Sequence, residues 1–557
     1  MKKILFALII IFGIFLRFWQ LNTLPGGLFL DELNMAVDAK TLVQNGTDQY
    51  GRHLPFYFED ATDWKLPGYI YATTFFYEIF GNQILTLHMT SALAGIASIF
   101  LIGYIAFLLF PEKKYIGYFA GATLALSPFA IHFSRISYET NLALTCLILY
   151  FIALFLVLHN KHTTWWFVVG TLATLVGNWT YPSARFIIPV FTLFFLCICY
   201  FANFSQIKRK NILLAASFLV VVAITFIPTI LFPFADARQL NLLSVDSKNG
   251  GLLTSLFLKT NSVFVSYLRE WNLEFLFDKG DLFAYRHGTK EQGIFLFIFI
   301  IPYFLGIFWA IQNVIKKNFS LVFLFCLALI CGLPSALSSE TPYGTRMLTM
   351  LIPYTIFIAV GLTRFFAWLG RQKKFLKTIL IILLSIIFVY QVCLFMYAYF
   401  VDFRQTSLPE FPTAPVQLAA YILHFHKQNP TKQIYFLTDR SCRTWSNDAL
   451  SLWFYDNLPN KPMIAWNNAY RQVRYAYKKG SPLEAYDRVT IPAAYIAADN
   501  LHLYAGKNNA QAPKGSLMVH CGYELGTYDK TSEQLDKVFY MYSVINEDPF
   551  YFTTRKK

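Results

Sequence analysis

The sequence predicts a polytopic α-helical membrane protein with an extracytoplasmic α/β domain after its last span. Hydrophobic residues make up 56% of the 557-residue chain, charged residues make up 14%, and the mean hydropathy is +0.44. These values lie outside the range of ordinary soluble domains. About 11 apolar stretches each approach the roughly 20 residues that a membrane-spanning helix needs, and polar sequence follows from Asp402. We therefore expect a transmembrane module over 1–401 and a separate domain over 402–557.

The apolar stretches give the expected spans in order. The first begins after Lys2-Lys3, as a signal peptide would, but the bulky residues from Leu16 to Trp19 stand where a cleavage site needs small ones. We therefore expect an uncleaved anchor. Two long loops, 22–83 and 235–292, interrupt the series. The spans are expected at 4–21, 84–110, 115–133, 140–158, 163–181, 186–204, 212–234, 293–311, 319–338, 347–363 and 378–401.

The basic residues set the predicted orientation. With the N-terminus in the cytoplasm, Lys and Arg gather in alternate loops, which is the positive-inside pattern of a multi-pass protein of the cell membrane. Both long loops and the C-terminal domain then lie on the extracytoplasmic face. The cytoplasmic clusters are Lys113-Lys114, Lys161, Lys208 to Lys210, Lys316-Lys317, and Arg371 with Lys373-Lys374.

Charge and composition also weigh against other classes of protein. The net charge of +15 does not indicate nucleic-acid binding, because much of it lies in those short clusters. His88 is the main ionisable residue expected within a span, whereas ion-coupled transporters usually carry charged groups at mid-membrane. A transporter or flippase of lipid-linked saccharides is kept as the alternative. The eight cysteines show no metal-ligand spacing, and a disulfide between Cys442 and Cys521 in the polar tail is left open.

The first long loop contains an acidic pair, Asp31-Glu32, at the start of a run that reads as a surface helix ending near Gly46. One explanation is that Asp31 caps this helix. The other is that a carboxylate held near lipid serves as a general base. Lys65, farther along the loop, either reaches up to the headgroups or binds a phosphate.

Other outer loops supply further candidates. Arg135 and Glu139 are four residues apart, so they either pair with each other on a helical turn or provide a phosphate-binding arginine and a second carboxylate. Arg346 stands where a span begins, and it either anchors that helix or meets a lipid phosphate. The secondary candidates are Arg286, His287, Arg185 and Tyr181.

Several of these segments carry a resemblance when they are taken in order. The Leu16-Arg17-Phe18 lead-in, Asp31-Glu32, the stretch Thr47 to Gly51, the stretch Lys65 to Tyr69, and Ser134-Arg135 with Glu139 resemble family 39 of the C-type glycosyltransferases. That group includes protein O-mannosyltransferases and bacterial lipid A aminoarabinose transferases. The resemblance covers roughly residues 1–400. It implies a multi-span enzyme that takes a sugar from a polyprenyl-phosphate carrier and adds it to an acceptor on the outer face.

The resemblance implies roles for individual residues. Asp31 matches the aspartate expected to act as catalytic base, and Glu32 completes the acidic pair of the mannosyltransferases. Lys65 is similar to the lysine of a Lys-Pro-Pro segment that helps to hold the carrier phosphate, although a leucine interrupts the segment here. Arg135 looks like the arginine of a Ser-Arg motif. Glu139 stands about where those families place a second acidic residue, usually aspartate, and the change to glutamate leaves open whether a divalent metal binds at Asp31 and Glu139.

The implied chemistry suits these residue types. The acceptor, which is a protein, a lipid or a glycan, must lose a hydroxyl proton to a base, and Asp31 is the candidate. The lipid phosphate departs as an anion, so the enzyme needs cations rather than a general acid. Lys65, Arg135 and Arg346 are the candidate cations. A single base without a covalent intermediate predicts inversion at the anomeric carbon.

The C-terminal part reads as a compact α/β domain. Apolar runs at 433–437, 493–497 and 516–519 predict strands, and 416–426 and 448–455 predict helices. Its sequence contains no nucleotide-binding loop and no nucleophile motif. We expect the domain to recognise an acceptor, contact a partner or cover the active face.

Overall fold

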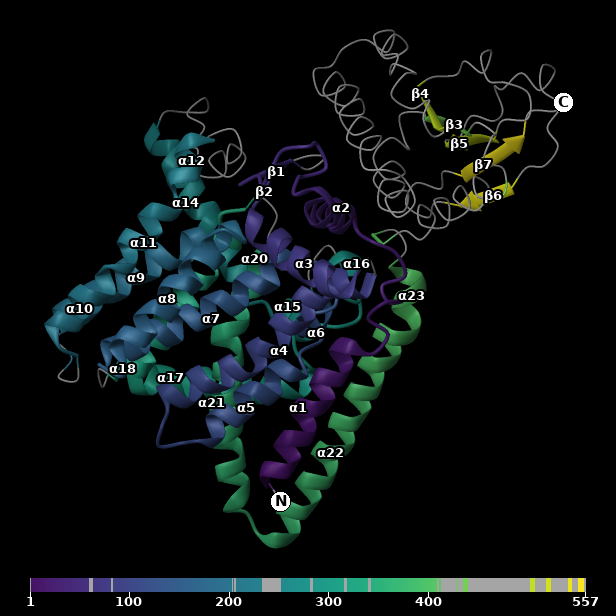
Figure 1. Cartoon of the computed structure of the whole chain (residues 1–557). Coiled ribbons are helices and arrows are strands. Elements are labelled where there is room, and N and C mark those ends of the chain that lie inside the picture. Colours follow the sequence, from purple (N-terminus) through teal and green to yellow (C-terminus); the bar gives the residue numbers. More distant parts are fainter. Residues whose placement is uncertain are drawn as a thin grey trace. The chain divides into compact units, whose positions relative to one another are not determined.

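The computed structural model is mainly helical, with a β-sheet in its C-terminal part (Figure 1). It describes residues 2–59, 64–81, 84–202, 204, 207–232, 252–280, 284–314, 318–338, 342–407, 410–411, 428, 434–438, 501–505, 517–521, 539–542 and 549–554. The chain divides into two compact units. The first comprises Met1–Asn22, Asp63–Ala72 and His88–Phe403, and the second comprises Thr23–Thr62, Thr73–Leu87 and Arg404–Lys557. The predicted 402–557 domain is therefore grouped with most of the first long loop.

All the predicted spans lie on helices, which confirms a polytopic α-helical membrane protein. Within the described residues, eight helical stretches are long and apolar enough to cross a membrane. The sequence predicted about 11, and the difference arises because the helices of three predicted spans, α1, α5 and α8, are only 17, 11 and 16 residues long and are not extended by a neighbouring helix into a longer apolar stretch. The main helices are α1 (Lys2–Phe18), α4 (Ile84–Leu109), α5 (Tyr115–Ala125), α6 (Pro128–Phe133), α7 (Glu139–Leu158), α8 (Thr163–Asn178), α9 (Pro182–Ala202), α10 (Arg209–Ala216), α11 (Phe218–Thr225), α12 (Ile227–Leu231), α17 (Ile300–Val314), α18 (Phe319–Cys331), α19 (Leu333–Ala336), α20 (Gly344–Met347), α21 (Leu351–Gly370) and α22 (Lys374–Tyr397).

Shorter elements connect these helices. They are α14 (Leu252–Arg269), α15 (Leu273–Phe277), α16 (Ala284–His287), η2 (Phe297–Phe299), η3 (Leu348–Met350), η4 (Ala398–Asp402) and α23 (Phe403–Thr406). Where it is described, the loop predicted over 235–292 thus contains the helices α14, α15 and α16.

The span predicted over 115–133 is two helices rather than one. Ser127 accepts the Ala130 N–H with its side-chain oxygen at 3.2 Å, and Pro128 follows it at the first helical position. A capping serine followed by proline starts a new helix and ends the previous one. The Ser127 hydroxyl also donates to the Ile294 carbonyl at 2.7 Å, so the break is tied to the start of a later span.

Small residues bring α17 and α21 into close contact. A Cβ atom on Gly306 would collide with the Phe357 carbonyl, and one on Gly361 would collide with the Pro302 carbonyl. Close backbone approach through glycine is a common way for helices to pack in a membrane, where lipid is as apolar as the side chains.

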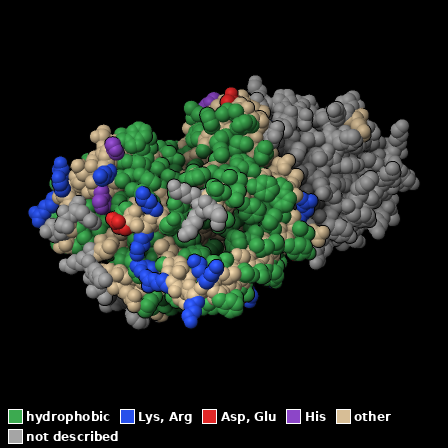
Figure 2. Space-filling view, turned by 90° about the horizontal axis from the view of Figure 1, so that it is seen from below, with side chains coloured by type: hydrophobic (Ala, Val, Ile, Leu, Met, Phe, Trp, Pro, Cys, Tyr) green, Lys and Arg blue, Asp and Glu red, His purple; other side chains and the backbone are tan. Residues whose placement is uncertain are grey.

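Basic side chains gather at one end of the helices of the first unit. The N-terminus, the α4–α5 loop and the α21–α22 loop lie at the lower end in Figure 1, and the view of that end in Figure 2 shows Lys and Arg side chains well in excess of acidic ones. Arg364 and Lys113 both lie over the ring of Trp309, at 4.5 and 5.2 Å from its centroid. This asymmetry is the one that the sequence predicted for the cytoplasmic side.

The first long loop contains a helix that the sequence analysis did not identify. After β1 (Phe58–Glu59) and β2 (Trp64–Lys65), helix α3 (Pro67–Phe80) begins at a proline and is mostly apolar, with Glu78 as its one charged residue. Its large side chains Phe75 and Ile79 are 61% and 56% exposed, as expected of a helix that lies against lipid. The loop also contains α2 (Leu30–Asn45), which ends at Gly46 in the left-handed conformation as predicted.

The C-terminal part contains a five-stranded mixed sheet in the order β4-β3-β5-β7-β6. Strand β3 (Ile434–Thr438) is parallel to β4 (Leu501–Ala505) and β5 (Leu517–Cys521), whereas β7 (Pro549–Thr554) is antiparallel to β5 and to β6 (Phe539–Tyr542). The strands predicted at 433–437 and 516–519 are confirmed. The strand predicted at 493–497, the two predicted helices and Cys442 lie outside the described residues.

Candidate functional site

The acidic pair lies in the first turn of α2, and its two members have different surroundings. Glu32 is fully buried, and its Oε2 accepts the Phe29 N–H at 2.8 Å. A glutamate that reaches back to the residue before the helix is half of a capping box. The helix is therefore capped by Glu32, and the expectation that Asp31 caps it is wrong. Asp31 is half-buried at the helix N-terminus, where the helix dipole favours its negative charge.

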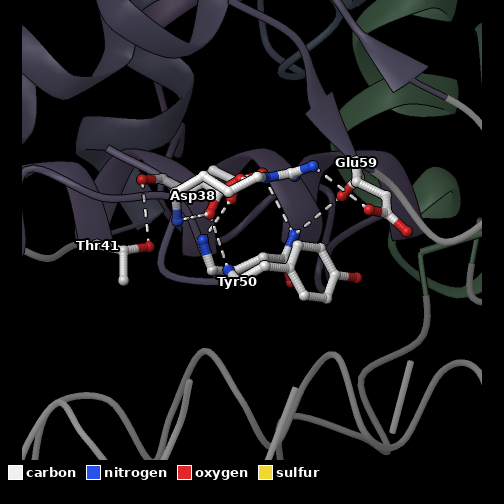
Figure 3. Close-up of polar contacts among 7 residues, drawn as sticks. Asp38, Thr41, Tyr50 and Glu59 are labelled. Carbon is white, nitrogen blue, oxygen red and sulfur yellow. Dashed lines mark hydrogen bonds and ion pairs between the residues drawn. The ribbon is translucent and has the colours of Figure 1, made fainter. Parts of the chain in front are cut away.

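A buried polar network holds the following loop against α2 (Figure 3). Both oxygens of Asp38 accept from Gln49, one from its backbone N–H at 2.9 Å and the other from its side-chain amide at 3.2 Å. Asp48 accepts the Nε–H of Arg52 at 2.6 Å, and Arg52 reaches Glu59 at 3.4 Å. The stretch Thr47 to Gly51 thus folds into a turn that fixes the helix carrying Asp31.

Burial governs the electrostatics of this network. It raises the pKa of Asp38 well above its usual value, while the hydrogen bonds from Gln49 lower it in part. The sequence analysis did not single out Asp38, although its spacing of seven residues from Asp31 places both on one face of a helix.

Lys65 and Glu139 form an ion pair within the first unit. The Lys65 Nζ lies 3.5 Å from the Glu139 Oε1, and the two side chains are 17% and 6% exposed. Glu139 is the first residue of α7, where the helix dipole favours a carboxylate. The structure therefore brings two of the predicted site residues together.

The Lys-Leu-Pro-Gly segment explains how Lys65 reaches this place. Pro67 starts α3, and the Gly68 N–H donates to the Trp179 carbonyl at 2.7 Å. A Cβ atom on Gly68 would collide with the Thr180 hydroxyl. Because glycine permits this approach, the start of α3 packs on the end of α8, and Lys65 is held three residues before that contact.

Arg135 is completely buried and binds the end of α1. Its Nη1 donates to the carbonyls of Leu16 and Trp19 at 2.8 and 2.7 Å. Its guanidinium lies over the rings of Tyr399 and Phe400, at 5.6 and 5.1 Å. In this conformation the side chain satisfies the free carbonyls at a helix C-terminus.

Arg17 adds a second buried arginine that the sequence analysis overlooked. Its Nε donates to the Ser134 hydroxyl at 3.1 Å, and its other nitrogens donate to the carbonyls of Gly13, Ala125 and Leu124. A charged residue inside a predicted span is the signal that would have found it. Naming His88 as the main ionisable residue of the spans was therefore wrong.

Arg346, His287 and Tyr181 converge on one loop of the same unit. The Arg346 guanidinium lies 5.0 Å from the centre of the Tyr343 ring and also contacts the Ser338 hydroxyl. The His287 ring centre lies 5.2 Å from that of Tyr343. Tyr181 donates to the Thr345 hydroxyl at 3.3 Å, and its phenol is close enough to Arg346 and Glu139 for both to act on it electrostatically.

The remaining secondary candidates have contacts of their own. Arg185 donates to the Asn178 carbonyl at 2.7 Å and to Thr229 at 3.2 Å. The Arg286 carbonyl accepts from the Nε2 of His132 at 2.9 Å, which requires the proton of that ring to be on Nε2. Among the residues that the structure describes, no group of three or more His, Cys, Asp or Glu side chains is arranged to hold a metal ion.

Comparison with known proteins shows what this chain resembles. Residues 65–232 match the family described as dolichyl-phosphate-mannose-protein mannosyltransferase. No curated protein sequence matches the chain. The matched segment includes Lys65, Arg135, Glu139 and Tyr181.

Solved structures of two membrane transferases share the fold. ArnT from Cupriavidus metallidurans in the apo state superposes with a TM-score of 0.51 at 12% identity, over 99% of this chain and 97% of that one. The same protein bound to undecaprenyl phosphate gives a TM-score of 0.50 at 12% identity, over 98% and 97% of the two chains. The archaeal oligosaccharyltransferase AglB from Archaeoglobus fulgidus, in complex with an inhibitory peptide and a dolichol-phosphate, gives 0.51 at 13% identity. This chain covers only 64% of the length of AglB, whereas 81% of this chain is aligned. The protein is therefore a membrane protein with the fold of the C-type glycosyltransferases, and the resemblance read from its sequence is confirmed.

Proposed function

We propose that this protein transfers a sugar from a polyprenyl-phosphate carrier to an acceptor at the extracytoplasmic face of the cell membrane. The observation that carries the proposal is the cluster of Lys65, Glu139, Tyr181 and Arg346 in loops at the ends of apolar helices. Its support is the fold shared with a transferase solved with undecaprenyl phosphate and another solved with dolichol-phosphate. The orientation, with the N-terminus cytoplasmic, rests on the basic end seen in Figure 2.

Lys65 and Arg346 are our candidates for binding the carrier phosphate. Lys65 is paired with Glu139, and Glu139 and Arg346 both act electrostatically on the phenol of Tyr181, so the two cations belong to one cluster. Positive charge fixed near the bridging oxygen stabilises the phosphate as it leaves, more strongly than it would in water. Arg135 keeps a supporting role in the proposal, since it binds the end of α1 rather than the cluster. His287 faces the same loop, whereas Arg185 and the backbone of Arg286 position neighbouring helices.

Asp31 is our candidate for the base that takes the acceptor proton. Its carboxylate is half-buried on a helix fixed by the Asp38 network, whereas Glu32 is engaged as a cap. Direct displacement with one base would invert the anomeric carbon. The carboxylate of Glu139 is bound by Lys65, so a divalent ion there would have to compete with an ammonium group. We therefore assign Glu139 to Lys65, and a metal at Asp31 stays a prediction.

The test is sugar transfer by the full-length protein in lipid nanodiscs. The donors would be undecaprenyl phosphate carrying a range of hexoses and pentoses, and the readouts are release of undecaprenyl phosphate and the anomeric configuration of the product. Asp31→Asn is expected to lower the rate by about 100-fold or more. The matched control is Glu274→Gln, which changes an exposed carboxylate paired with Lys279.

Two results would count against this function. Transfer by folded Asp31→Asn at the wild-type rate would remove Asp31 as the base. Movement of undecaprenyl phosphate sugars across a sealed vesicle, without transfer to any acceptor, would instead support the flippase alternative.

A further inference from the structure

Glu270 is a buried acid that the proposed chemistry does not use. It follows α14 directly, its side chain is 0% exposed, and it lies outside the spans predicted from the sequence. The Tyr354 hydroxyl donates to its backbone carbonyl at 2.9 Å, which ties the end of α14 to α21. The backbone of Glu270 is thereby held in place.

The carboxyl group occupies a space left by Gly332. A Cβ atom at Gly332 would collide with the Glu270 Oε2 and would lie 2.8 Å from the ring of Tyr267. The backbone of Gly332, with φ of −83°, is open to any residue, so glycine is required here for space. Neither oxygen of Glu270 has a hydrogen-bond partner among the described residues, although the Ser335 side chain faces it.

The groups around this carboxyl are neutral. The titratable side chains close to it are the phenols of Tyr267 and Tyr354; the Cys331 thiol is close to Tyr267, and Tyr303 is close to both phenols. Burial raises the pKa of Glu270 to about 9, so the group is protonated at neutral pH. A neutral carboxylic acid tolerates such surroundings, whereas an unpaired carboxylate does not.

Glu270 is connected to Arg346 through a series of contacts that begins at Gly332. Gly332 precedes α19, and within that helix the Ser335 hydroxyl accepts the Tyr343 N–H at 3.5 Å. The Tyr343 ring lies under the Arg346 guanidinium at 5.0 Å. This series of contacts connects the residues around the Glu270 carboxyl to Arg346.

We propose that Glu270 is a positioning residue for carrier binding, which in its protonated form holds α19 and Tyr343 so that Arg346 faces the carrier phosphate. This inference rests on the proposed function. Loss of the proton would place a charge against Gly332 and Tyr267, and α19 would shift away to let water reach the carboxylate.

The experiment measures binding of undecaprenyl phosphate to the full-length protein in nanodiscs between pH 7 and 10. If only the protonated form binds well, the wild-type affinity should fall about tenfold more than that of Glu270→Gln between pH 8 and 10. Titration of Lys65 and of the phosphate itself affects both proteins equally, so the ratio of the two affinities isolates Glu270. Glu274→Gln, an exposed acid four residues farther on, should keep the wild-type pH profile.

A second readout does not need the carrier. Trp271 lies next to Glu270, and the centre of its ring is 5.2 Å from that of the Tyr354 ring. The fluorescence of Trp271 is isolated by subtracting the spectrum of Trp271→Phe. This fluorescence should change near pH 9 in the wild type and stay constant in Glu270→Gln. Equal pH profiles for the wild type and Glu270→Gln in both readouts would overturn the proposal, as would loss of carrier binding by Glu270→Gln at pH 7. If the wild type bound no carrier at any pH, the proposed function would fail, and the Trp271 transition alone would decide whether Glu270 titrates as stated.

Discussion

The Nζ of Lys65 lies 3.5 Å from Oε1 of Glu139, and the two side chains come from segments that are more than 70 positions apart in the chain. A pair this buried has given up most of its hydration, so each charge depends on the other. A phosphate that binds Lys65 therefore meets Glu139 as a competitor for the same ammonium group.

Removing the charge of Lys65 and removing the charge of Glu139 should change the affinity for the carrier in opposite directions. Lys65→Met is expected to weaken undecaprenyl phosphate binding by about tenfold or more, because a charge-assisted contact is lost. Glu139→Gln is expected to strengthen it severalfold, since the ammonium no longer has a carboxylate partner. Binding is measured by isothermal titration in nanodiscs, with Lys279→Met, an exposed lysine, as the control. A weaker carrier affinity in Glu139→Gln would contradict the competition and would assign Glu139 to the carrier site itself.

Glu32 offers a test of capping against catalysis. Glu32→Ala should lower the free energy of unfolding by about 1 kcal/mol, because the Phe29 N–H loses its acceptor. Glu32→Gln keeps an acceptor oxygen at the same place, so its thermal midpoint should lie closer to that of the wild type. The sugar-transfer rates of Glu32→Ala and Glu32→Gln should rank in the same order as their stabilities. A rate for Glu32→Gln as low as that of Asp31→Asn, at wild-type stability, would instead give Glu32 a part in the chemistry.

The contribution of Arg135 to the stability of the protein should depend far more on the shape of its guanidinium group than on its positive charge. Arg135→Lys keeps the positive charge but cannot donate to Leu16 and Trp19 while stacking on Tyr399, so a loss of about 2 kcal/mol or more is expected. The measurement is thermal unfolding in detergent, together with carrier binding at a temperature where the variant is folded. Wild-type stability with weakened carrier binding would show that Arg135 contacts the phosphate.

The sequence was sufficient for features that depend on local composition. Eight long helical stretches, the end of α2 at Gly46 and the strands at β3 and β5 follow from hydropathy, glycine and alternation. The break at Ser127-Pro128 was missed because the hydropathy of both flanking helices is continuous, although the serine-proline signal was present.

The partners of the charged residues were harder to predict. Arg135 and Glu139 are spaced for a helical pair, yet Tyr138 is extended and α7 starts only at Glu139, so the two residues are not on one helix. Glu139 pairs with Lys65 from a distant segment, and a long-range contact of this kind has no signal in a single sequence. Arg17 had a signal, its position within an apolar span, and was overlooked.

The Asp38–Gln49 contact permits a test in which the roles of the two side chains are exchanged. Asp38→Asn turns an amide N–H toward the Gln49 amide, so either two donors face each other or the Gln49 amide turns over and gives up its donation to the Glu59 carbonyl, and a loss of about 1–3 kcal/mol in the free energy of unfolding is expected. Adding Gln49→Glu restores an acceptor opposite the new amide, while the oxygen of residue 38 still accepts the backbone N–H of residue 49. The double variant should therefore be more stable than either single variant, by thermal unfolding of the full-length protein.

The same contact predicts the pH dependence of stability. The pKa of Asp38 is raised by burial, so the folded state binds its proton more tightly than the unfolded state. Its contribution to stability is therefore complete at low pH and is lost as the pH rises from the ordinary carboxyl range through the raised folded value. Asp38→Asn should flatten this part of the stability profile, whereas Thr41→Ser, a neighbouring change without charge, should not.

A double variant no more stable than Asp38→Asn would mean that Gln49 does not hold α2 through this pair, and the fixed position proposed for Asp31 would lose its physical basis.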